Sequence, residues 1–135
     1  MLLERGSSKV TNDFPKNKKK ILIVDDDDTI LHILRRFFVG EGFEVLVARD
    51  GSEALKRLKA ENPALVLTDI KMPSFSGIDL IRFIHQNMKG IPIVAMTAYP
   101  HLYPEKKNGN EVDAYFRKPF DINEMLLSIE KILGG

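Results

Sequence analysis

Aspartates follow two separate apolar segments of this chain, and their side chains are well suited to chemistry. Asp25 and Asp26 come directly after Ile21–Val24, and Asp69 follows 65–68. Carboxylates gathered at the ends of buried strands repel one another unless a cation lies among them. Hard oxygen ligands of this kind select Mg²⁺ or Ca²⁺ over softer metals. The pattern therefore indicates that the three aspartates form an acidic pocket for one divalent ion, which we expect to be Mg²⁺.

Two later residues add groups that suit a phosphate. Thr97 ends a further apolar segment, and Lys118 directly follows the last one. Lysine offers phosphate a point positive charge, and threonine offers a hydroxyl donor. Carboxylates, a divalent ion, an ammonium group and a hydroxyl together suit phosphoryl transfer, in which the protein mainly positions groups and neutralises charge. A carboxylate can itself be the nucleophile and form an aspartyl phosphate.

Strand-like and helix-like segments alternate along the chain and would bring these residues together. The expected strands are 21–24, 44–48, 65–68, 93–96 and 114–117, and the expected helices are 29–39, 52–61, about 78–88 and about 122–133. This alternation predicts an α/β fold, with a doubly wound, five-stranded parallel sheet and helices on both faces. Ligands bind beyond the carboxyl ends of the strands in such sheets. The aspartates, Thr97 and Lys118 all fall at those ends.

Two stretches carry weaker signals. We interpret Asp27 and Asp28 as part of a solvated loop and as a helix cap, respectively, rather than as metal ligands. The residue that caps the helix is expected to be Asp28 or Thr29. Between Tyr99 and Asp113, prolines and a turn signal leave few apolar residues. We expect any helix there to be short or irregular, and the stretch to be mobile.

Length and composition limit the class of protein. The 135 residues suggest one domain, and 44% hydrophobic and 29% charged residues are ordinary for a globular protein. The absence of cysteine excludes disulfides, thiolate metal sites and a cysteine nucleophile. No apolar stretch reaches the roughly 20 residues that span a bilayer, and the first residues lack the apolar core of a signal peptide. We therefore expect a cytoplasmic protein without membrane contact.

The charge is distributed unevenly. Residues 1–20 hold six positive and two negative side chains, a net +4, which leaves −3 for the rest of a chain with net charge +1. Residues 1–18 form a basic polar leader that we expect to be flexible, 19–133 the folded domain, and 134–135 a short tail. A lysine run can contact nucleic acid. The simpler interpretation is a solvated tail, so we expect no direct nucleic-acid binding.

The ordered set of motifs resembles the receiver domain of bacterial two-component response regulators. The matching segments are Val24–Asp26, Asp69–Pro73 with Gly77, Thr97–Ala98 and Tyr115–Phe120. The similarity covers about residues 19–133. It implies a flavodoxin-like topology, and a signalling switch rather than a turnover enzyme.

The resemblance also implies roles at the acidic pocket. Asp69 matches the phosphoacceptor, which takes a phosphoryl group from a sensor histidine kinase or a phosphotransfer protein. Asp26 matches the direct Mg²⁺ ligand and Asp25 the one that acts through water, while the backbone carbonyl of Lys71 matches a further metal ligand. An unidentified downstream protein would bind the altered surface.

Further roles are implied for the later motifs. Lys118 matches the lysine that pairs with the phosphoryl group, and the bond to Pro119 is expected to be cis. Thr97 and Tyr115 match the hydroxyl and aromatic residues that move on activation. Glu111 stands where relatives commonly have glycine, so the resemblance does not extend to the family's usual partner surface. Lys71 and Tyr99 occupy variable positions that bear on the rate of dephosphorylation.

A second resemblance competes with the first. Ile21–Leu31 also looks like the first motif of haloacid-dehalogenase-type phosphatases, four apolar residues followed by Asp-x-Asp-x-Thr. Asp25 would then be the nucleophile and Asp27 the general acid. Against this alternative, no acidic pair follows a strand beyond Lys118, and Asp69 would have no role.

Overall fold

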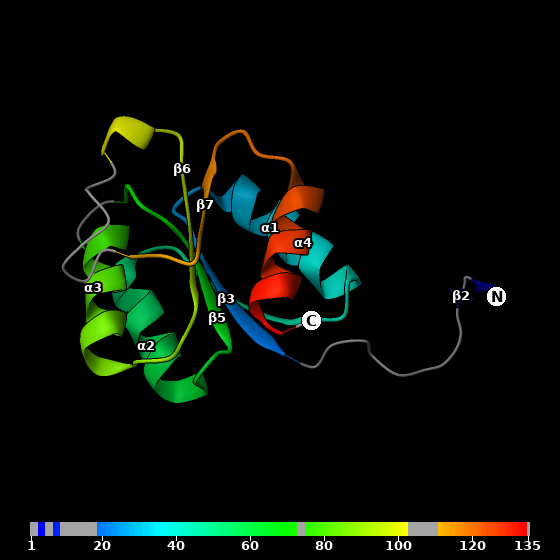
Figure 1. The fold of residues 1–135 in the computed structure, drawn as a ribbon, viewed down its shortest axis with the longest axis horizontal. Coiled ribbons are helices and arrows are strands. Elements are labelled where there is room, and N and C mark those ends of the chain that lie inside the picture. Colours follow the sequence, from blue (N-terminus) through cyan, green and yellow to red (C-terminus); the bar gives the residue numbers. More distant parts are fainter. Residues whose placement is uncertain (1–2, 5–6, 9–18, 73–74, 103–110, 135) are drawn as a thin grey trace.

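The computed structural model describes residues 3–4, 7–8, 19–72, 75–102 and 111–134 (Figure 1). Its centre is a five-stranded parallel sheet in the order β4-β3-β5-β6-β7. The strands are β3 (Lys20–Val24), β4 (Glu44–Ala48), β5 (Leu65–Asp69), β6 (Ile93–Thr97) and β7 (Ala114–Arg117). The helices are α1 (Asp28–Gly40), α2 (Gly51–Glu61), α3 (Gly77–Asn87) and α4 (Ile122–Ile132). This is the flavodoxin-like order, so the predicted fold class is confirmed.

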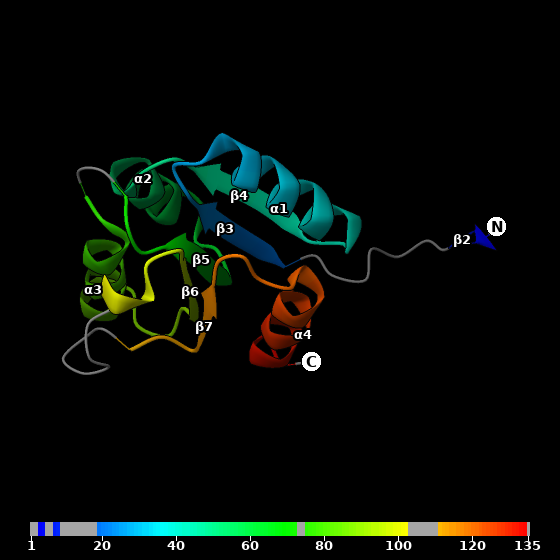
Figure 2. The ribbon, with the colours of Figure 1, turned by 90° about the horizontal axis from the view of Figure 1, so that it is seen from above.

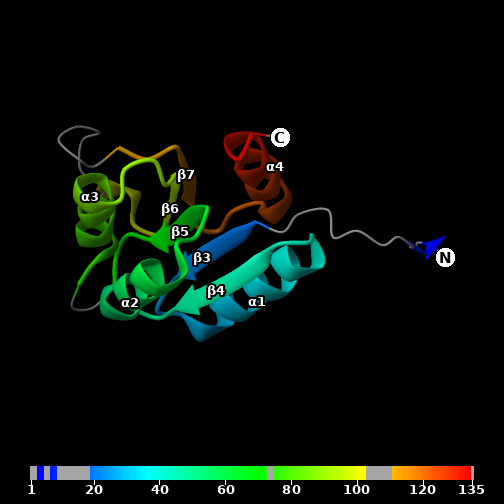
Figure 3. The same cartoon turned by 90° about the horizontal axis from the view of Figure 1, so that it is seen from below.

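The helices lie in two layers, one on each face of the sheet (Figures 1 and 2). Successive side chains of a strand point to opposite faces of the sheet, so alternate strand residues pack into two separate cores. One core packs Ile21, Ile23, Leu65 and Leu67 against α1 and α4, and the other packs Leu22, Val24 and Val66 against α2 and α3. The view from below shows the same division (Figure 3). Because β3 and β5 are covered on both faces, only their ends can present polar groups.

The helices that follow the sheet strands begin at side chains that cap them. Asp27, Asp50, Ser76 and Asp121 each accept hydrogen bonds from backbone N–H groups of the first helical turn. The prediction that Asp28 or Thr29 caps the first helix was therefore wrong by one residue. Asp27 takes that place because its carboxylate reaches the N–H groups of both Thr29 and Ile30.

The region between β6 and β7 has little regular structure in the part that is described. A short 3₁₀ helix, η1 (Pro100–Leu102), follows β6, which agrees with the expected short or irregular helix. Residues 103–110 lie outside the described residues, as does most of the basic leader, so the expected mobility of both stays a prediction. Within the leader, β1 (Leu3–Glu4) and β2 (Ser7–Ser8) pair in antiparallel fashion. None of the described helices combines the length and apolarity needed to cross a bilayer.

Gly77, the first residue of α3, packs directly against the end of β5. Its N–H donates to the carbonyl of Ile70 at 3.0 Å. A Cβ atom at this position would overlap the backbone oxygen of Asp69 and lie 2.7 Å from Cα of Ile70. The close approach of α3 therefore requires glycine, and it holds the backbone of Asp69 in place.

We expect Gly77→Ala to lower the free energy of unfolding by about 1–3 kcal/mol, because a backbone must move to admit the methyl group. The matched control is Gly40→Ala, also in a helix, where a Cβ atom has no neighbour within 4 Å. That variant should be unchanged or more stable by up to about 1 kcal/mol. Urea unfolding of both variants checks the prediction, and equal stabilities would contradict it.

Candidate functional site

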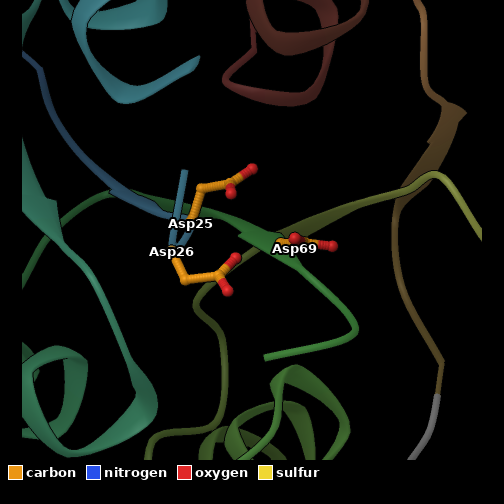
Figure 4. A group of neighbouring side chains, drawn as sticks. All are labelled: Asp25, Asp26 and Asp69. Atoms are coloured by element: carbon orange, nitrogen blue, oxygen red, sulfur yellow. The ribbon is translucent and has the colours of Figure 1, made fainter. Parts of the chain in front are cut away.

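Three carboxylates meet where the strand order of the sheet reverses. Asp25 and Asp26 follow the last residue of β3, and Asp69 is the last residue of β5, the neighbouring strand. Figure 4 shows all three side chains projecting from these two strand ends. One oxygen from each lies within 4.8 Å of the others. The sheet thus brings together residues that are more than forty positions apart in the sequence.

Lys118, which follows the last residue of β7, links two of these carboxylates. Its Nζ donates to Oδ2 of Asp25 at 2.6 Å and to Oδ2 of Asp69 at 3.2 Å. The lysine reaches them because β7 ends at Arg117, on the same edge of the sheet. The side chain of Lys118 is only 14% exposed, and that of Asp25 is fully buried. These charges are therefore largely withdrawn from water, and each depends on the others for compensation.

The protonation equilibria reflect this crowding. Burial raises the pKa of Asp25, and the hydrogen bond from Lys118 opposes that rise only in part. Burial, and then the nearby charge of Asp25, raise the pKa of Asp69 as well. For Lys118, burial alone would lower the pKa, but its hydrogen bonds and charge interactions with Asp25 and Asp69 together outweigh burial and raise it. Without a metal ion, the site therefore has more negative charge than it accommodates well.

Backbone groups orient the same carboxylates. The N–H of Asp27 donates to Oδ1 of Asp25 at 2.9 Å, and the N–H of Lys71 lies 3.4 Å from Oδ1 of Asp69. The hydroxyl of Thr68 is buried and donates to the backbone oxygen of Asp69 at 2.9 Å. Sequence reasoning did not single out Thr68, since one threonine within an apolar strand carries no distinctive signal.

The residues expected to move on activation lie on the two neighbouring strands. Thr97 is fully buried, and its Oγ1 accepts a hydrogen bond from the N–H of Tyr99 at 2.9 Å. Tyr115 lies on β7 with its hydroxyl buried, and burial raises the pKa of that hydroxyl. The bond between Lys118 and Pro119 is cis, the isomer that the resemblance implies. The sheet places these residues near the site, and their roles stay predictions.

The donor set fits a hard divalent cation. Oxygens around octahedral Mg²⁺ lie about 3–4 Å from one another, given metal–oxygen distances of about 2.1 Å. Carboxylate oxygens of Asp25, Asp26 and Asp69 that already lie within 4.8 Å of one another need only a small contraction to reach that spacing. Asp26 is exposed while the other two are buried, so the cluster is open to solvent on one side. Such a site can hold an ion that keeps part of its water shell.

The competing phosphatase interpretation finds no support in this arrangement. Its general acid would be Asp27, but that side chain caps α1 and accepts hydrogen bonds from Thr29 and Ile30. Its nucleophile would be Asp25, which is fully buried and paired with Lys118. Asp69, by contrast, keeps a slight exposure to solvent.

Proteins of similar sequence include a phosphotransferase and a transcriptional regulatory protein. The chain is 37% identical over 117 residues to sporulation initiation phosphotransferase F of Bacillus subtilis, covering 85% of this chain and 94% of that protein. It is 35% identical to the alkaline phosphatase synthesis transcriptional regulatory protein PhoP of the same organism, covering 85% of this chain but 48% of that protein. The chain therefore spans about half the length of PhoP.

Solved structures of similar shape agree with the sequence matches. The response regulator TrrA of Thermotoga maritima, determined in complex with Mg²⁺ and BeF, has a TM-score of 0.77 and 35% identity, covering 84% of this chain and 98% of that one. A signal receiver domain from Pseudomonas fluorescens has a TM-score of 0.81 and 28% identity, covering 87% and 95%. The family of response regulator receiver domains matches residues 21–130. With the acidic cluster at the expected edge of the expected sheet, this chain belongs to the response regulator receiver domain family.

Proposed function

We propose that Asp69 is the phosphoacceptor of this receiver domain, and that Asp25, Asp26 and the backbone carbonyl of Lys71 help to hold Mg²⁺ beside it. The observation that carries the proposal is the meeting of three carboxylates within 4.8 Å, with Lys118 bonded to two of them. No single strand could supply this set. A bound Mg²⁺ would neutralise charge on the phosphoryl oxygens and on the carboxylates.

The transfer itself is a displacement at phosphorus. A carboxylate oxygen of Asp69 attacks the phosphorus of a phosphohistidine, a P–O bond forms and the P–N bond breaks. The electron pair of the broken bond leaves with the imidazole nitrogen, and the product is an acyl phosphate on Asp69. The backbone near Asp69 is fixed by Gly77 and Thr68, so the nucleophile is positioned before the donor arrives.

Lys118 stabilises the charge that the transfer brings. Its ammonium group lies 3.2 Å from the carboxylate of Asp69, within reach of phosphoryl oxygens placed there. Thr97 provides a second donor, because its oxygen accepts from Tyr99 and its own hydrogen is left to donate. Movement of Thr97 toward the phosphoryl group, with Tyr115 following, would shift the domain between two packings.

The donor is a protein with a phosphorylated histidine, either a sensor histidine kinase or a phosphotransfer protein. The output is a change in the surface offered to a downstream protein, and the proposal includes no contact with nucleic acid or membrane. Relatives of this chain include full regulators and also a protein of nearly the same extent as this domain. The cytoplasm is the compartment in which we place this exchange.

Intact-mass analysis after incubation with acetyl phosphate tests the proposal. We expect a covalent phosphoryl adduct on the wild type in the presence of Mg²⁺, and a loss of most of it in EDTA. Asp69→Ala should carry no adduct. Asp25→Ala should keep a smaller Mg²⁺-dependent adduct, because it loses a ligand but not the nucleophile. An adduct that persists on Asp69→Ala, or vanishes only with Asp25→Ala, would falsify the assignment.

The metal site makes a separate prediction about stability. Because the pKa of Asp69 is raised, its charge destabilises the metal-free fold at neutral pH. Asp69→Asn should therefore raise the melting temperature in EDTA by a few degrees, about 1 kcal/mol. The gain should shrink as pH falls through that raised pKa, because the wild-type carboxyl then also becomes neutral.

In the same thermal unfolding experiment, Mg²⁺ should make the melting temperature of the wild type higher than that of Asp69→Asn. Millimolar Mg²⁺ should stabilise the wild type much more than Asp69→Asn. The control is Asp26→Asn, whose side chain is exposed: it should gain little in EDTA and still lose the response to Mg²⁺. Equal Mg²⁺ responses in all three proteins would exclude this cluster as the metal site.

A further inference from the structure

A cation–π contact bridges the two loops that leave the site. Nζ of Lys71 lies 4.4 Å from the centre of the Tyr99 ring. Lys71 is the second residue after Asp69, and Tyr99 is the second residue after Thr97. Both side chains are exposed, Tyr99 by 45%. The contact therefore connects the segment after β5 with the segment after β6 outside the buried core.

Each partner is tied to a group that takes part in phosphoryl transfer. The N–H of Lys71 lies 3.4 Å from a carboxylate oxygen of Asp69, and the N–H of Tyr99 donates to the hydroxyl oxygen of Thr97 at 2.9 Å. Tyr99 also immediately precedes η1 and makes an edge-to-face contact with His101, with ring centres 6.2 Å apart. A change in the position of the Tyr99 ring would therefore reach both Thr97 and the start of the β6–β7 connection.

The charge balance of the site favours a different partner for Lys71 after phosphorylation. Three carboxylates, the ammonium of Lys118 and one Mg²⁺ sum to no net charge, so the resting site has little demand for another cation. An acyl phosphate on Asp69 carries about −1.5 to −2 in place of the single charge of the carboxylate. A charged hydrogen bond to phosphate is stronger than an exposed cation–π contact. The Lys71 ammonium should then leave the ring.

We propose that Lys71 and Tyr99 form a charge-sensitive latch that is closed in the resting domain and opened by the phosphoryl group on Asp69. The proposal rests on the phosphoacceptor function above. It adds to Thr97 and Tyr115 a second pair of residues that responds to the charge of the phosphoryl group. Lys71 exchanges the Tyr99 ring for a phosphoryl oxygen. The released ring no longer restrains the segment that leads from Thr97 into η1.

NMR of the full chain tests the latch directly. The ring current of Tyr99 should shift the ε-methylene signals of Lys71 upfield in the resting protein, and Tyr99→Leu should abolish that shift. Mg²⁺ with beryllium fluoride, a phosphoryl analogue, should return the Lys71 signals to ordinary positions. Lys59, whose Nζ lies 5.8 Å from the centre of the Phe83 ring, provides an internal control. It connects α2 with α3, and its signals should not respond.

Binding of the same analogue provides a second measurement. Tyr99→Leu removes the competing contact and should tighten binding by about two- to fivefold. Lys71→Met removes the cation and should weaken binding, although the backbone near the metal is retained. In a Lys71→Met background, Tyr99→Leu should have no effect, since the two substitutions break the same contact.

The outcomes separate the latch from the function on which it rests. Lys71 signals that stay shifted while the amides of Asp69 and Thr97 respond to the analogue would overturn the latch alone. The latch would also be overturned if Tyr99→Leu weakened binding of the analogue, or if it had the same effect in the Lys71→Met background. Either result would show that the ring is only structural. No response at Asp69, with no phosphoryl adduct by mass, would remove the proposed function and the latch together.

Discussion

The contact of Lys118 with both Asp25 and Asp69 is the interaction on which the site depends. Two carboxylates at adjacent strand ends are largely withdrawn from water, where their mutual repulsion is poorly screened. Burial raises the pKa of each carboxyl, and the single ammonium group of Lys118 opposes that rise only in part. The site is left with an unmet requirement for positive charge. In the proposed function, a divalent ion would meet that requirement.

The rest of the fold keeps these charges from moving apart. β3 and β5 are buried on both faces by the two helix layers, so their ends cannot shift without disturbing both cores. Gly77 brings the start of α3 against the backbone of Asp69. By contrast, Lys71 and Tyr99 are exposed and joined by a weak contact. The buried strand ends are thus held by two packed cores, whereas the contact between Lys71 and Tyr99 lies outside them.

Sequence reasoning was most reliable where a residue's neighbours along the chain decide its structure. Apolar runs located the five sheet strands, although β5 and β6 each extend one residue further, to Asp69 and Thr97. The final strand residue is polar, so an apolar pattern ends before the strand does. The cap of α1 was misplaced for a similar reason. Four consecutive aspartates offer several acceptors, and backbone geometry selects Asp27.

The amino-acid sequence by itself determined the alternation of strands and helices, the acidic and basic residues at strand ends, and the resemblance of their order to a receiver domain. Local periodicity and residue type suffice for these, because they depend on neighbours along the chain. The tertiary structure decided which carboxylate Lys118 approaches more closely, the need for glycine at position 77, and the pairing of Lys71 with Tyr99. These depend on distances between segments that are remote in sequence, and only the packing of helices on the sheet sets such distances.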